Sequence, residues 1–263
     1  MAFQNIAVVK GEGPVARIIL NRPDERNAMS AAMGREIQQA VAAINAEPRV
    51  RVVVVSGAGT AFSAGGDIKS LAKEAGLAET GEGLGGGAAF YRSFLSVKRL
   101  EVPTIAAING HAIGAGLCFA LGCDLRVMHA KAKVGVTFVK LGIHPGMAAT
   151  WHLPGLVGPA VSAELLYTGR LVGAEEALSM GLVNRTAAED FEAVVEELAS
   201  EIAANAPLAI RALKKTLACS GVRSLDETLE TEARAQAETF TTEDAAEGIK
   251  AVLEKRRPQF RGR

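Results

Sequence analysis

The sequence has few aromatic residues, few cysteines and no net charge. Of its 263 residues, 5% are aromatic and three are cysteine, while 29 Lys and Arg balance 29 Asp and Glu. A zero net charge argues against nucleic acid as a partner, because binding to the phosphate backbone depends on an excess of basic groups. Three cysteines without a CxxC motif predict no disulfide framework and favour a reducing compartment.

Long apolar runs are also missing. No run of eighteen apolar residues occurs, and the N-terminal MAFQNIAVVKGEG has no basic segment leading into a long apolar run. We therefore expect no membrane-spanning helix and no signal peptide. With 49% apolar residues, the core should consist of Ala, Val, Leu and Ile. These features predict a cytoplasmic globular protein, long enough for one large domain or for a core with an appendage.

Glycine turns that follow apolar strands are the most informative feature that is present. Residues 49–56 (RVRVVVVS) form a continuous apolar run, typical of a strand covered on both faces, and lead into GAGTAFSAGGDI. Residues 103–108 lead into a turn containing Gly110, Gly114 and Gly116, followed by an apolar helical segment. Glycine permits close approach to the backbone, and the first N–H groups of a helix have no intrahelical partners. Such turns can present bare amides to a negative atom.

Strands should alternate with helices over the first 180 residues or so, which predicts an α/β fold. Residues 6–10 and 16–21 suggest a hairpin, and Ser30 is a plausible N-cap for the helix after it. The glycine-rich segment 71–87 buries too little apolar surface to offset its ordering entropy, so we expect a mobile loop there. Helices alone should follow from about residue 160, with a capping box at Ser224 and Glu227.

Several common motifs fail or match only in part. GxGxxG fails because Phe62 occupies the place of its last glycine, no P-loop occurs, and the four histidines lack metal-ligand spacing. AFSAG resembles a serine-hydrolase elbow without its first glycine, with Asp124 and His144 or His152 following in hydrolase order. Ser63 is therefore one candidate nucleophile.

Two glycine turns side by side could aim two N–H groups at one oxygen and form an oxyanion hole. SGAGTAFSAGGDIKSL and PTIAAINGHAIGAGLCFALGCDLRV, about forty residues apart, resemble the crotonase (enoyl-CoA hydratase/isomerase) superfamily. LGIHPGMAATWHLPGLVG, LLYTGRLVGAEEALSMGLVN and EDAAEGIKAVLEKRRPQF also match its pattern. The resemblance implies a spiral of ββα units over 1–200 and a helical trimerisation part over 201–263. It further implies a homotrimer or hexamer, an acyl-CoA thioester as substrate, and no metal or nicotinamide cofactor.

The resemblance assigns residues by position. The N–H groups of Gly66 and Ala115 would form the oxyanion hole. The residues implied in binding the acyl-CoA are Arg26, Ala28, Ala64, Asp67, Ile68, Gly114, Cys118, Phe138, Phe240 and Lys255. Of these, Phe240 and Lys255 would reach toward the nucleotide. Tyr91 and Arg92, close to the glycine-rich segment, are further candidates for facing the acyl group.

Two positions depart from the family pattern. Hydratases of this family carry two glutamates, and this chain has Cys118 and Phe138 at the corresponding positions. One interpretation is a reaction that needs no base, such as decarboxylation of a carboxyacyl thioester. In a second, His144 replaces the missing glutamates; in a third, the chain binds acyl-CoA without chemistry. Cys118 could be a nucleophile, but a cysteine in an apolar helix is more often a small buried hydrophobe.

Overall fold

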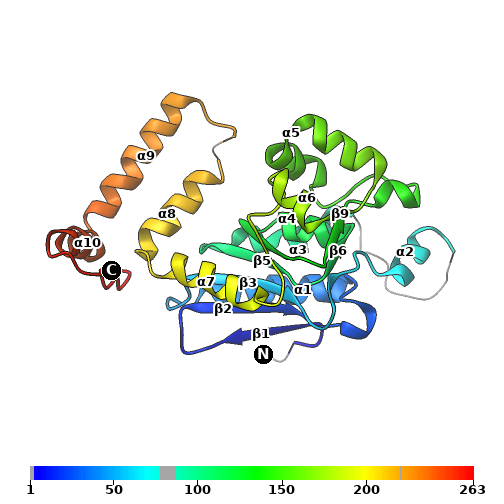
Figure 1. Ribbon diagram of the computed structural model, residues 1–263, viewed down its shortest axis with the longest axis horizontal. Coiled ribbons are helices and arrows are strands. Elements are labelled where there is room, and N and C mark those ends of the chain that lie inside the picture. The colour runs from blue at the N-terminus through cyan, green and yellow to red at the C-terminus, as the bar shows by residue number, and fades with distance from the viewer. Residues whose placement is uncertain (1–2, 78–86, 220) are drawn as a thin grey trace.

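The computed structural model describes residues 3–77, 87–219 and 221–263 (Figure 1). Two sheets form the body of the molecule. The six-stranded sheet has the order β1 (Ile6–Lys10), β2 (Val15–Leu20), β3 (Val52–Gly57), β5 (Thr104–Ile108), β7 (Leu125–His129) and β10 (Arg185–Ala187). The four-stranded sheet has the order β4 (Ala61–Ser63), β6 (His111–Ile113), β8 (Lys133–Gly135) and β9 (Val172–Gly173). β1 and β2 pair in antiparallel fashion, as the sequence predicts, and from β2 to β10 the large sheet is parallel.

Helices pack on both faces of the large sheet, with α1 and α4 on one face and α7 on the other. The helices of the described chain are α1 (Ala31–Asn45), α2 (Ile68–Glu74), α3 (Gly87–Phe94), α4 (Ala115–Leu121), α5 (Ala149–Thr168), α6 (Ala174–Ser179), α7 (Phe191–Ala203), α8 (Pro207–Leu217), α9 (Leu225–Phe240) and α10 (Glu243–Leu253). Short 3₁₀ turns occur at η1 (Pro23–Glu25), η2 (Leu95–Arg99) and η3 (Phe138–Leu141).

Strand β3 lies in the middle of this packing. Val53 and Val55 belong to the core that includes α1 and α4, whereas Val52 and Val54 pack with α7 on the opposite face. All six residues of β3 are buried, which confirms the prediction of a strand covered on both faces. After β3 the chain passes through β4 into the first glycine turn, which contains Gly65 and Gly66.

Side-chain caps fix several helix starts where the sequence predicts them. Ser30 accepts a hydrogen bond from Met33 N at the start of α1, and Ser224 forms a capping box with Glu227 at the start of α9. The prediction of a loop beginning at residue 71 was wrong at that end, because α2 continues to Glu74. Asp67 caps this helix by accepting from Lys69 N and Ser70 N. Residues 78–86 of that predicted loop lie outside the described residues.

Helices α8, α9 and α10 form a C-terminal arm that extends away from the sheets (yellow to dark red in Figure 1). Its apolar side chains are largely exposed. Those at least half exposed are Leu213, Leu217, Val222, Leu225, Leu229, Phe240, Ile249, Val252 and Leu253. Within the described ranges, no helix combines the length and apolarity that crossing a membrane requires.

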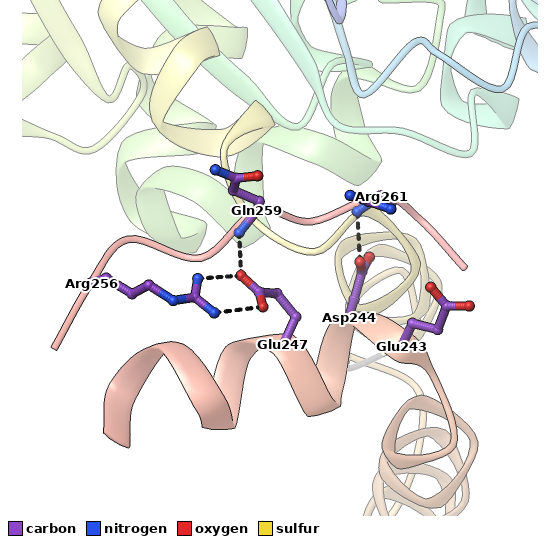
Figure 2. A pocket seen from close by; sticks show the side chains of 6 residues that line it. All are labelled: Glu243, Asp244, Glu247, Arg256, Gln259 and Arg261. Carbon is purple, nitrogen blue, oxygen red and sulfur yellow. Dashed lines mark hydrogen bonds and ion pairs between the residues drawn. The ribbon is translucent and has the colours of Figure 1, made fainter. Parts of the chain in front are cut away.

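The tail (254–263) folds back against α10 through two carboxylates, as Figure 2 shows. Asp244 is 2% exposed and accepts from Arg261 N at 2.6 Å and Gly262 N at 2.8 Å. Glu247 accepts both terminal nitrogens of Arg256, at 2.6 and 2.8 Å, and also the N–H of Gln259. These bonds fix the tail on the arm.

The Glu247 contacts predict a pH-dependent stability. The Arg256 guanidinium and the Gln259 N–H lower the pKa of Glu247 to about 2. A carboxyl whose pKa is lower in the folded state stabilises the fold above its unfolded pKa, and that contribution disappears as the pH falls through the folded value. Glu247→Gln should therefore lower the denaturant midpoint of unfolding at pH 7. The difference from wild type should shrink as the pH falls from about 4.5 toward 2.

Glu230→Gln is the matched control, because Glu230 is an exposed glutamate on α9. Its midpoint should follow wild type across this range. A Glu247→Gln deficit that stays constant down to pH 3 would contradict the assignment.

Candidate active site

The two glycine turns lie against each other at the ends of β4 and β6. These strands are parallel neighbours, with Ser63 paired to Ala112. A Cβ atom placed on Gly65 would lie 2.6 Å from Ile113 O and 3.5 Å from Ala115 N, so a side chain at position 65 is excluded. Gly65 also has a φ of 97°, in the left-handed region that favours glycine. The prediction that the turns adjoin is therefore confirmed by their contact.

Two backbone N–H groups at this contact have no acceptor. Gly66 is held beside Met29, because Met29 N donates to Gly65 O at 2.8 Å and Asp67 N donates to Met29 O at 3.1 Å. These bonds leave Gly66 N free. Ala115 is the first residue of α4, and its N-cap, Gly114, has no side chain. Within the described part of the chain, neither Gly66 N nor Ala115 N donates a hydrogen bond.

Both residues line a pocket of about 700 Å³, called the turn pocket below. Nine residues predicted from the sequence line it: Arg26, Ala28, Ala64, Gly66, Ile68, Gly114, Ala115, Phe138 and His144. Its other described lining residues are Asp24, Glu25, Gly65, Leu71, Phe90, Tyr91, Ile113, Thr137, Lys140, Leu141 and Ile143. The volume is in the range of pockets that hold a small organic molecule, roughly 300–1,000 Å³.

Four of the predicted residues do not line the turn pocket. Asp67 caps α2, and its Oδ2 lies 3.3 Å from an Arg22 nitrogen. Burial alone would raise the pKa of Asp67, but hydrogen bonds from Ser70 N and Arg22 outweigh it and hold the pKa below its usual range. Cys118 lies behind the pocket wall in α4, whereas Phe240 and Lys255 are on the arm and the tail. Phe240 lines a different cavity, at the junction of α8, α9 and α10.

The two positions that depart from the family pattern have different surroundings. Cys118 is fully buried among apolar neighbours, and this burial raises the pKa of its thiol to about 12. Phe138 is half-buried and presents its ring to the turn pocket. Among the described lining residues, the only carboxylates are Asp24 and Glu25, both on η1, and Glu25 is paired with Arg22. Among the described residues, no carboxylate lines the pocket beside Phe138.

His144 is the only described imidazole that lines the turn pocket. Its Nδ1 lies 2.7 Å from Pro145 O. A carbonyl oxygen only accepts, so Nδ1 carries the hydrogen of this bond and Nε2 of the neutral ring keeps its lone pair. The bond to Pro145 thus orients the ring and fixes the tautomer that could take up a proton at Nε2.

The structure does not support the serine-hydrolase interpretation. Ser63 is completely buried, and its hydroxyl donates to Asn27 O at 2.8 Å and accepts from Gly65 N. Asp124, the expected third member of a triad, instead accepts from Thr104 and Lys214. Ser63 therefore holds the first glycine turn in place, and that interpretation was wrong.

Sequence reasoning identified the pocket's glycine turns better than its apolar wall. Tyr91, from α3, was a candidate through its place beside the glycine-rich segment, and it lines the turn pocket. Its hydroxyl packs against Gly146 so closely that a side chain at position 146 would collide with it. Lys140, Leu141 and Ile143 were missed, although they stand between Phe138 and His144 on η3 and the turn after it. Across the described residues, no group of three or more His, Cys, Asp or Glu side chains could hold a metal ion.

The chain matches known proteins along almost its whole length. The family model described as enoyl-CoA hydratase/isomerase matches residues 10–263. Crotonyl-CoA hydratase of Syntrophomonas wolfei is 37% identical over 263 residues, which cover 99% of both chains. The short-chain-enoyl-CoA hydratase of Clostridium acetobutylicum is 34% identical over 255 residues, 96% of each chain. The crystal structure of enoyl-CoA hydratase from Bacillus anthracis has a TM-score of 0.90 at 36% identity, covering 99% of this chain and 100% of that one.

The α/β architecture thus defines a crotonase-fold protein, and the expectation from the sequence is confirmed. The chain belongs to the enoyl-CoA hydratase/isomerase family.

The surroundings of Cys118 predict an unreactive thiol. Because burial raises its pKa to about 12, almost none is thiolate at pH 8, and the buried sulfur is also shielded from reagents. Native protein treated with iodoacetamide at pH 8 should show no adduct on Cys118 by peptide mass spectrometry. Denatured protein should be alkylated at this residue. Rapid labelling of Cys118 in the native protein would restore the nucleophile interpretation.

Proposed function

We propose that this chain is an enzyme acting on acyl-CoA thioesters, which it converts through an enolate stabilised by the N–H groups of Gly66 and Ala115. The observation that carries the proposal is the pair of unbonded amides on the wall of one pocket. Negative charge grows on the thioester oxygen as the enolate forms. Preorganised donors stabilise such charge by about 3–4 kcal/mol each. The relatives named as crotonyl-CoA and short-chain-enoyl-CoA hydratases support the thioester as substrate.

The coenzyme A part of the substrate would lie along the η1 side of the turn pocket. Arg26, Ala28, Ala64 and Ile68 line that side, and Ile68 is 68% exposed although it is apolar. Arg26 has a positive φ of 51°, which turns the chain sharply at the rim. Asp67 would act by capping α2 beside this groove. Phe240 and Lys255 remain proposed contacts of the nucleotide end, carried by the arm and the tail.

The reaction itself should differ from ordinary hydration. Hydration needs one group to activate water and another to handle the α-carbon proton. Phe138 and Cys118 can do neither, whereas His144, the one described imidazole on the pocket wall, is an oriented base. We therefore expect slow hydration of crotonyl-CoA and a reaction that depends mainly on the oxyanion hole. No cofactor besides the coenzyme A of the substrate is proposed.

Decarboxylation of a carboxyacyl thioester is the second candidate, favoured because no described residue places a carboxylate beside Phe138. Breaking the bond between the α-carbon and the carboxylate leaves its electron pair in the enolate and releases carbon dioxide, so no base is required. A non-catalytic acyl-CoA scaffold is the third candidate. It would bind the thioester without exchanging its α-protons. An enzyme that forms the enolate by removing an α-proton exchanges that proton in deuterated water, and a decarboxylase adds one solvent deuteron to the α-carbon as carbon dioxide leaves.

The C-terminal part (201–263), which comprises the end of α7, the arm and the tail, is proposed to mediate trimerisation. The assembly would be a trimer or a hexamer built from two trimers. Nine large apolar side chains on the arm are at least half exposed in the single chain, more than a solvent-facing surface usually gathers. Light scattering after size exclusion should give the mass of three or six chains. Val252→Asp, at a position 78% exposed, should reduce this mass. A wild-type monomer would refute the proposal.

Ala115→Pro tests the oxyanion hole. Proline is tolerated at the first position of a helix, since its N–H has no intrahelical acceptor there, so this change removes one donor while α4 stays intact. Deuterium exchange at the α-carbon of an acyl-CoA should slow by about 10²–10³-fold. Ala115→Gly keeps the N–H and is the control, with a rate close to wild type. Equal rates for the proline variant and wild type would exclude this amide as a donor.

His144→Gln tests the base. If Nε2 takes the α-proton, the exchange rate should fall by about 10²–10⁴-fold while binding of the acyl-CoA changes little. His111→Gln is the control, because His111 is exposed, accepts from Lys133 N and does not line the turn pocket. If exchange is unaffected while carbon dioxide is released from a carboxyacyl-CoA at the wild-type rate, the base assignment is wrong and the decarboxylase candidate gains support.

A further inference from the structure

A second cavity lies at the opposite end of β3 from the turn pocket. Its volume is about 490 Å³. Four separate segments close around it: the β1–β2 turn, the loop from α1 to β3, the start of α8, and the tail. It shares no lining residue with the turn pocket. Because β3 has six residues and a strand rises about 3.3 Å per residue, the two sites are roughly 20 Å apart.

Four guanidinium groups line this cavity, which we call the basic cavity: Arg49, Arg51, Arg211 and Arg261. Glu12 is the one acidic residue among the described residues that line it. Arg49 is paired with Glu47, at 3.3 Å. In the described residues, none of the other three arginine side chains forms an ion pair. Like charges gathered around one cavity repel each other, so an anion bound between them would be stabilised.

Two of these arginines have different hydrogen bonding. Arg51 is held by carbonyl groups, since Nη1 donates to Ala203 O at 3.0 Å and Nη2 donates to Phe260 O at 2.7 Å. These bonds fix its position but leave its charge without a counter-ion. The Nε of Arg211 is buried and has no hydrogen-bond partner among the described residues. A buried donor without an acceptor is uncommon, and together with the lack of an ion pair it leaves the guanidinium of Arg211 uncompensated within the described chain.

The start of α8 adds one backbone donor to the same cavity, the N–H of Leu208, since Pro207 has no N–H and Ile210 N already donates to Ala206 O. Pro207 and Leu208, the first two residues of this 11-residue helix, line the cavity. The N-cap, Ala206, has no side chain that could accept from the first N–H groups. An anion would complete this helix end, because helix N-termini attract negative groups. Arg211 lies one turn further along the same helix, so its charge and the helix end act together.

We propose that the basic cavity binds a phosphate group, carried by a phosphorylated small molecule or present as free phosphate. Arginine is suited to this chemistry because its planar fork of N–H donors matches phosphate oxygens. The cavity is much larger than a bare phosphate and falls within the size range of small-molecule pockets. A phosphomonoester such as a nucleoside monophosphate therefore fits the space better than the free ion.

Calorimetry on the full chain tests this proposal, in chloride buffer free of phosphate and sulfate. The probes are inorganic phosphate and AMP, titrated separately. Binding of either one should weaken about 10- to 100-fold in Arg211→Gln, since a hydrogen bond to a charged group is lost. Tighter binding of AMP than of phosphate identifies a phosphorylated molecule as the ligand, and equal binding identifies the ion.

Variants separate the basic cavity from other anion sites on the protein. Arg49→Gln is the second variant, because its side chain is 73% exposed and its loss should not impair folding. It should also weaken binding. Arg99→Gln removes an exposed arginine outside the cavity and should leave binding unchanged. Absence of binding to wild type at millimolar concentrations would overturn the proposal. So would equal binding by wild type, Arg49→Gln and a folded Arg211→Gln variant, since the anion would then occupy another site.

Discussion

The close contact between the two glycine turns is the constraint on which the site depends. Gly65 lies so near Ile113 O and Ala115 N that no side chain fits between them. Likewise a Cβ on Gly116 would be 2.5 Å from Ser63 O. The first turn of α4 therefore packs directly against the end of β4, with no room for a side chain at position 116. Both turns follow strands of one sheet, and the pairing of β4 with β6 fixes their relative position. Two N–H groups are thereby held free at one place without any ligand to organise them.

This preorganisation separates charge stabilisation from acid–base chemistry. The amide donors come from backbone that packing holds fixed, so they persist whatever side chains surround them. The side chains at the two positions where the sequence predicts a departure from the family pattern are apolar: Phe138 lines the pocket, and Cys118 is buried in α4. A family member with its donors intact and one oriented imidazole would still stabilise an enolate. It would also favour substrates that generate this enolate with little help from a base.

Much of this arrangement could be predicted from the sequence, and the reasons for the failures are physical. The run RVRVVVVS and the two glycine turns carry strong local patterns, so β3 and the adjoining turns that contain Gly66 and Ala115 could be placed in advance. The second sheet could not, since its strands have only two or three residues and show no periodicity. Ser63 had the local pattern of a nucleophile, and only the bond to Asn27 O shows its structural role. The basic cavity was missed because its arginines come from segments more than 200 residues apart in the chain.

The most direct test of the central claim is a crystal structure with a non-reactive acyl-CoA analogue bound. The account predicts the thioester oxygen in the turn pocket, about 2.7–3.1 Å from both Gly66 N and Ala115 N. It also predicts His144 Nε2 as the nearest base to the α-carbon. A thioester oxygen that contacts neither amide, with the acyl group bound outside the turn pocket, would contradict it.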